Sequence, residues 1–99
     1  MNLTRDDYIV KSVPWKIREV PASNPYLDDK YGRTIFDTYT IYLWEGMPWQ
    51  QKIETLVHET SHVLCEGKEK VNLLIEDDLR TYSEDLIDTL IRNGLVRPI

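Results

Sequence analysis

The only two histidines of this chain lie four residues apart, with a glutamate directly after the first, in the segment HETSH from His58 to His62. On an α-helix of about 3.6 residues per turn, these imidazoles project from one face about 6 Å apart along the axis. Two imidazoles so placed can bind the same Zn²⁺. Glu59 points about 100° away from His58, yet it can still reach a metal-bound water and take its proton. The pattern therefore predicts a zinc site with Glu59 as general base.

The residues around this segment predict a helix over 48–66 that can present both histidines to solvent. Apolar residues and one threonine recur at helical spacing on one side of it: Ile53, Leu56, Val57, Thr60 and Leu64. Helical-wheel arithmetic places His58 and His62 almost opposite this set. One face of the helix is therefore expected to lie against a sheet, while the other opens onto a cleft.

A catalytic zinc needs a third protein ligand and an open coordination position. We expect the third ligand on a second helix over 72–93, which carries six acidic candidates: Glu76, Asp77, Asp78, Glu84, Asp85 and Asp88. Glu84 borders the apolar face of that helix, so it is favoured, and Asp88 is the next choice. Cys65 lies seven residues after His58, too far along one helix to share its ion, and is expected to pack as a small residue.

The remaining elements predict an α+β domain of about three strands packed on the HETSH helix, followed by the second helix. Residues 1–12 are expected to form a lead-in without regular structure. The segment 13–20 alternates Trp15, Ile17 and Glu19 with the opposite set, which is typical of a strand.

A loop over 21–32 connects that strand to the next segment, and we expect it to serve as a connector. The segment 33–44 is rich in β-branched and aromatic residues, and a turn at Asp37-Thr38 divides it into two antiparallel strands. Ile41 and Leu43 should face one way, and Tyr42 and Trp44 the other. Asn93-Gly94 should end the second helix.

Composition restricts the class of protein. Of the 99 residues, 41% are hydrophobic and 29% are charged, which is typical of one globular domain. The single cysteine and the absence of a long apolar run favour a cytoplasmic protein that does not interact with membranes. The net charge is −5 and the basic residues are scattered, so nucleic-acid binding is disfavoured as the main activity.

Several segments together resemble a known family. These are YGRTIFDTYTIYL, the spacer WEGMPWQQKIET, the LVHETSH segment and SEDLIDTLIRNGL, which cover about residues 31–95. In this order they resemble the small zincin metallopeptidases of the ImmA/IrrE-like type, found in phages and mobile elements.

The resemblance implies a zinc metalloendopeptidase that hydrolyses peptide bonds, with narrow specificity for a partner protein. His58 and His62 would bind the zinc, Glu59 would be the general base, and a carboxylate of the second helix would be the third ligand. The strand Thr40–Trp44 would be the edge strand that pairs with an extended substrate. Tyr39, Tyr42 and Tyr82 could donate to the oxyanion, and the sequence does not choose among them. Packing in the core or on the surface is the favoured interpretation for each.

A second interpretation is a zincin scaffold that serves as a binding or regulatory module with little or no proteolysis. The chain is small, and it has SEDLIDTLI where many members of the family carry Glu-x-x-Ala-Asn and a Phe-Ala pair.

Overall fold

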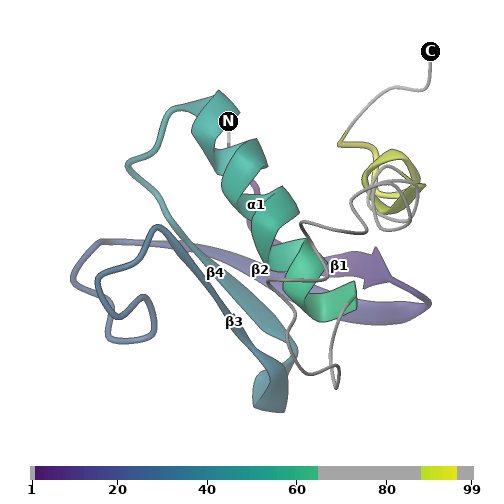
Figure 1. Cartoon of the computed structure of the whole chain (residues 1–99), viewed down its shortest axis with the longest axis horizontal. Helices are drawn as coiled ribbons and strands as arrows, with labels where there is room; N and C mark the ends of the chain where they lie inside the picture. Colours follow the sequence, from purple (N-terminus) through teal and green to yellow (C-terminus); the bar gives the residue numbers. More distant parts are fainter. Residues whose placement is uncertain (1, 65–87, 96–99) are drawn as a thin grey trace, which may run out of the picture.

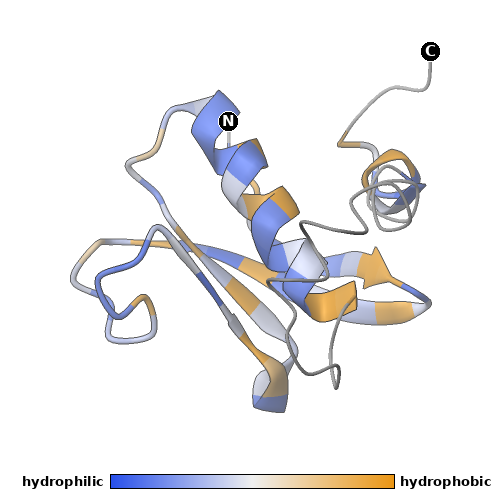
Figure 2. Cartoon of the chain, viewed as in Figure 1, coloured by the Kyte–Doolittle hydropathy of each residue, from blue (hydrophilic) through white to orange (hydrophobic). Residues whose placement is uncertain are grey.

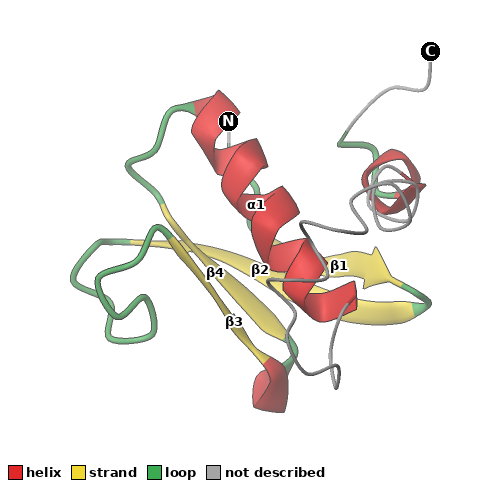
Figure 3. Cartoon of the chain, in the orientation of Figure 1, coloured by secondary structure: helices red, strands yellow, loops and turns green. Residues whose placement is uncertain are grey.

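The computed structural model describes residues 2–64 and 88–95, in which a four-stranded sheet lies under one main helix (Figures 1 and 3). The elements are β1 (Arg5–Val10), β2 (Val13–Val20), β3 (Gly32–Ile35), β4 (Thr40–Trp44) and α1 (Trp49–Leu64), and residues 88–92 are also helical. This confirms the predicted α+β class. No helix within the described ranges is long and apolar enough to cross a membrane.

The strands are arranged in the order β1-β2-β4-β3, so the sheet is mixed. β1 pairs with β2 and β3 with β4, both antiparallel, whereas β2 and β4 run parallel in the centre. The predicted strand over 13–20 is confirmed with the same bounds. The predicted turn is also confirmed as a short 3-10 helix at Phe36–Thr38, after which Tyr39 adopts a left-handed conformation with φ 51°.

The prediction of an irregular lead-in is wrong for Arg5–Val10, because these residues form β1, the fourth strand. Tyr8 and Val10 are buried, while Asp6, Asp7 and Ile9 are exposed. An edge strand needs only one apolar face, so its other positions can be charged. A segment with so many charged residues is easily predicted to be a loop.

Side chains alternate across the sheet, and one face forms the core with α1. Trp15 and Ile17 of β2 and Ile41 and Leu43 of β4 are buried on this face, as the sequence predicted for β4. α1 packs on β3 and β4 and also touches β1. Figure 2 shows orange apolar segments on the strands, whereas much of α1 is blue.

The predicted buried stripe of α1 is confirmed for its central positions. Leu56, Thr60 and Leu64 are buried, and Ile53 and Val57 are partly buried against the core. His58, on the other side of the helix, is exposed. The helix therefore presents His58 away from the sheet, whereas His62 is half-buried.

A buried hydroxyl pair fastens α1 to β1. The Thr60 hydroxyl lies 2.7 Å from the Leu56 carbonyl oxygen and 2.7 Å from the Tyr8 hydroxyl. Because a hydroxyl has one proton and Thr60 donates it to that carbonyl, the Tyr8 hydroxyl must donate to Thr60 Oγ1. Burial raises the pKa of Tyr8 to about 12.

Stability is therefore expected to decrease at alkaline pH through Tyr8. An unfolded chain loses this proton near pH 10, whereas the folded protein keeps it to about pH 12, so raising the pH through this interval favours unfolding. Urea unfolding of the wild type and Tyr8→Phe between these pH values measures the effect. The variant should lose about 1 kcal/mol of stability at neutral pH, and its stability should fall less steeply with pH. Equal slopes would contradict the assignment.

A buried ion pair connects α1 to β2. Lys52 Nζ of α1 pairs with Glu19 Oε1 of β2. The Lys52 side chain is 10% exposed to solvent and the Glu19 side chain is 0% exposed. The backbone N–H of Leu3 donates to the other oxygen of Glu19. The carboxylate thus joins the helix, the central sheet and the N-terminal segment.

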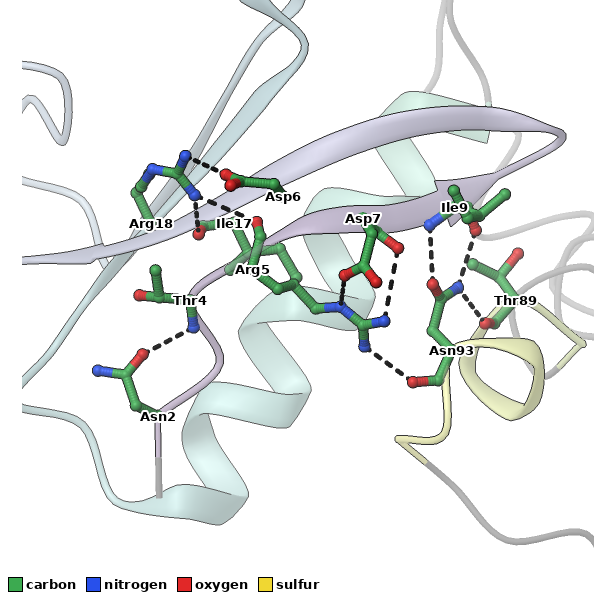
Figure 4. A network of polar contacts seen from close by, with 10 residues as sticks. All are labelled: Asn2, Thr4, Arg5, Asp6, Asp7, Ile9, Ile17, Arg18, Thr89 and Asn93. Carbon is green, nitrogen blue, oxygen red and sulfur yellow. Dashed lines mark hydrogen bonds and ion pairs between the residues drawn. The ribbon is translucent and has the colours of Figure 1, made fainter.

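Asn93 joins the C-terminal helix to the outer edge of β1 (Figure 4). Its side-chain oxygen accepts the Ile9 N–H at 2.7 Å, and its amide nitrogen donates to the Ile9 carbonyl at 2.8 Å. One amide group thus satisfies the same backbone donor and acceptor that a further strand would bind. The predicted helix end at Asn93-Gly94 is confirmed, since Gly94 has φ 72° and the Leu95 N–H donates to the Leu90 carbonyl.

Candidate metal centre

The two histidines of α1 converge on one point. The Nε2 atoms of His58 and His62 lie 3.1 Å apart, and their rings meet edge to face at 84°. Two imidazole nitrogens on one tetrahedral zinc, each at about 2.0–2.1 Å, would be about 3.3 Å apart. The donor pair therefore fits Zn²⁺ with little adjustment.

Glu59 belongs to the same group although it is buried. A carboxylate oxygen of Glu59 and one ring nitrogen from each histidine all lie within 4.8 Å of one another. Glu59 is only 7% exposed, because its side chain points toward the sheet. Its carboxylate thus reaches the metal position from the sheet side, beside both histidines.

Thr34 of β3 holds this carboxylate in place. The Thr34 hydroxyl donates to Glu59 Oε1 at 2.8 Å. A carboxylate oxygen has a second lone pair, and Oε2 is a second acceptor, so the contact fixes the group while leaving capacity to accept another proton. This hydrogen bond joins β3 to α1 across 25 positions of the chain, so no local sequence pattern predicts it.

Gly32 allows α1 to approach β3 this closely. A Cβ atom at Gly32 would lie 2.6 Å from Thr55 Cγ2 and 3.3 Å from the Glu59 side chain. The first distance is shorter than any ordinary contact, and a β-branched methyl cannot move far. Gly32 is therefore required by the packing that brings Thr34 to Glu59.

Thr34→Val is expected to destabilise the protein by about 1–3 kcal/mol, because it leaves a buried carboxylate oxygen without its donor. Thr34→Ser keeps the hydroxyl and should lose much less. Urea unfolding of both variants measures the difference. Equal losses would show that the methyl group, and not the hydrogen bond, matters at this position.

The surroundings of His62 favour its neutral form. Burial lowers the pKa of His62, and the nearby Glu59 carboxylate opposes this, while His58 and Lys30 lower the pKa further. A metal ligand must be neutral imidazole, so the shift favours metal binding.

The edge strand differs from the one that the family resemblance implies. Thr40–Trp44 was expected at the edge, but β4 lies between β2 and β3 in the sheet. The strand at the edge beside the site is β3, which also carries Thr34. The order of strands along the chain predicts the pairing of β3 with β4 but not which of them lies at the edge. β4 is interior because it also pairs with β2 in parallel.

The third ligand stays a prediction. Glu84 lies outside the described residues, as do Cys65 and the other acidic candidates except Asp88. Asp88 is exposed and pairs with Arg92 at 2.9 Å. Within the described ranges, the metal-binding group contains His58, Glu59 and His62 and does not include Asp88.

Two of the three tyrosines considered for stabilising the oxyanion, Tyr39 and Tyr42, pack against other aromatic residues. Tyr42 lies on the sheet face away from α1 and stacks on Tyr26, with ring centroids 4.8 Å apart. Tyr39 packs edge-on against the buried Trp15. Neither of these contacts involves the histidines, and Tyr82 lies outside the described residues.

The two histidines and Glu59 were predicted from the sequence, whereas Thr34 and Gly32 were not. The only sequence signal was the glycine two residues before a threonine in a predicted strand. Comparison of the chain with protein-family models, with curated proteins and with solved structures gives no match. Among the described residues, His58, Glu59 and His62 of α1 form the group that could hold a metal ion.

Proposed function

We propose that this protein is a zinc-dependent metallopeptidase that hydrolyses peptide bonds in a peptide or protein substrate. The observation that carries the proposal is the convergence of two imidazoles and one carboxylate, within 4.8 Å of one another, on a helix next to a sheet edge.

His58 and His62 would hold the zinc through Nε2, and the proposal keeps Glu84 as the expected third ligand. Such a ligand set, two histidines and one carboxylate, is common in catalytic zinc sites. The ion would polarise the scissile carbonyl and lower the pKa of a bound water.

The protein residues would contribute the proton transfer and the orientation. Glu59 would accept the proton of the attacking water and return it to the leaving amine. Thr34 would act as a positioning residue, because its hydroxyl fixes one oxygen of this carboxylate. The backbone of β3 would pair with an extended substrate at the edge of the sheet.

Zinc content tests the proposal. The wild type, purified without added metal and measured by mass spectrometry, should contain about one zinc per chain, as a single site requires. His58→Ala should contain little zinc while circular dichroism shows a folded protein. Glu54→Gln, an exposed change on the same helix, should keep its zinc. Zinc-free wild type, or unchanged zinc in His58→Ala, would overturn the metal site.

The same assay tests the third ligand. If Glu84 binds the zinc, Glu84→Gln should lose zinc, whereas the control Asp85→Asn should keep it.

A further inference from the structure

The side chains of β3 that point away from α1 form a row on the sheet face opposite the candidate metal centre. Alternation along the strand directs Gly32 and Thr34 toward α1, so Arg33 and Ile35 lie on the other face of the sheet. Tyr31 extends this row by one position, because its carbonyl accepts the Trp44 N–H at 2.8 Å. Arg33 precedes Thr34, whose hydroxyl binds Glu59, so Arg33 and Glu59 lie at the same position along β3 but on opposite faces of the sheet.

The two edges of the sheet are not equivalent. Asn93 occupies backbone groups of Ile9 on the outer side of β1 (Figure 4). In the part of the chain that the structure describes, no strand lies on the outer side of β3. A peptide that adds a strand to the sheet at the metal centre must therefore do so at β3.

Arg33 provides a positive charge at this edge. The residue is half-buried, and its guanidinium makes one long, exposed contact to the Tyr26 carbonyl oxygen at 3.4 Å. No carboxylate among the described residues forms an ion pair with it, in contrast to Arg5, Arg18 and Arg92. Its neighbour across the ladder is Tyr42, which carries no charge. A side chain on an added strand would thus meet an uncompensated guanidinium.

Tyr31 provides an apolar surface two positions from Arg33. Its ring stacks on Trp44 with centroids 5.9 Å apart, yet 58% of the residue is exposed. The stack holds the ring in place, and its other side is accessible to a further side chain. Neighbouring strands bring side chains on the same face within about 4.5–5.5 Å at Cβ, which is close enough for such contacts.

We propose that the site selects extended peptides with an aspartate or glutamate opposite Arg33 and an aromatic residue two positions away, over Tyr31. Charge complementarity at Arg33 and stacking on Tyr31 act on the substrate face that points away from the metal. This inference rests on the proposed function, because it assigns specificity to the same site.

Binding of a peptide array to zinc-loaded Glu59→Gln tests the specificity without hydrolysis of the probes. The array varies each position of an eight-residue peptide through acidic, basic, aromatic and small residues. Peptides with an acidic residue two positions from an aromatic one should be enriched. Adding Arg33→Glu should lower their binding about tenfold and favour basic peptides instead, since the cross-strand pair changes from attractive to repulsive.

Lys16→Glu is the matched control. Lys16 is an exposed residue on the same face, but it belongs to β2 in the interior of the sheet. The control makes the same change in net charge and should leave the preference within about twofold of the parent, as expected for screened surface charges.

Three results would overturn the inference: no enrichment of any peptide, an unchanged preference in Arg33→Glu, or an equal shift in Lys16→Glu. Failure of the proposed function looks different. Zinc analysis of the same samples would then find no metal, or the zinc-loaded wild type would cleave no peptide. If the wild type binds zinc and cleaves peptides, an unchanged preference after adding Arg33→Glu to Glu59→Gln contradicts only the role of Arg33.

Discussion

Glu59→Gln is expected to reduce peptide hydrolysis by about 10²–10⁴-fold, which is the usual contribution of a general base, while the protein keeps its zinc. Glutamine has the same shape, and its side-chain oxygen can still accept the Thr34 hydroxyl proton at the position of Glu59 Oε1. The amide cannot take a proton from water at neutral pH. The change therefore removes the base without removing the packing around it.

The measurement needs a substrate, which mass spectrometry of a proteome-derived peptide mixture incubated with the zinc-loaded wild type can supply. Rates on the cleaved peptides are then compared for the wild type, Glu59→Gln and Glu54→Gln. Glu54 is exposed on the same helix, so its variant controls for the lost charge and should match the wild type. Hydrolysis by Glu59→Gln at the wild-type rate would exclude Glu59 as the base.

Lys52→Met should have the largest effect on stability, a loss of about 3–5 kcal/mol, because it leaves a buried carboxylate without its cation. The Glu19 side chain is fully buried, and among the described residues its other partner is the backbone N–H of Leu3. Methionine fills much of the volume of the lysine stem. The loss should therefore come from the uncompensated charge and not from a cavity.

Removing both charges separates these causes. The double variant Glu19→Leu and Lys52→Met should recover most of the lost stability, since replacing a buried ion pair with apolar groups is often neutral. Lys16→Met changes an exposed lysine of the same strand as Glu19 and should alter stability by less than about 0.5 kcal/mol. Urea unfolding measures all three. A loss in the double variant as large as in Lys52→Met would contradict the electrostatic explanation.

Local periodicity explains which features the sequence predicted well. The spacing of His58 and His62 is one helical turn, so a single helix places both imidazoles on one face whatever surrounds it. The same holds for the alternation of Ile41 and Leu43 with Tyr42 in β4, which was predicted and is confirmed. These features depend on residues within one element.

Pairing between distant segments explains what was predicted wrongly or missed. β1 was read as a lead-in because three of its six residues, Arg5, Asp6 and Asp7, are charged. The pairing with β2 explains how a strand can carry these charges, since Asp6 of β1 forms an ion pair with Arg18 of β2 (Figure 4). The expected edge strand was wrong for the same reason, since the parallel pairing of β2 with β4 joins segments more than 20 residues apart.

The sequence by itself determined the candidate metal-binding group of this protein, because residue type and helical spacing suffice to bring two imidazoles together. The tertiary structure alone decided how Glu59 is held and which strand lies beside it. Thr34 reaches Glu59 across 25 positions of chain, and a glycine is needed at position 32 because Thr55 lies opposite it. Such contacts follow from how strands and helix pack, and no local pattern encodes them.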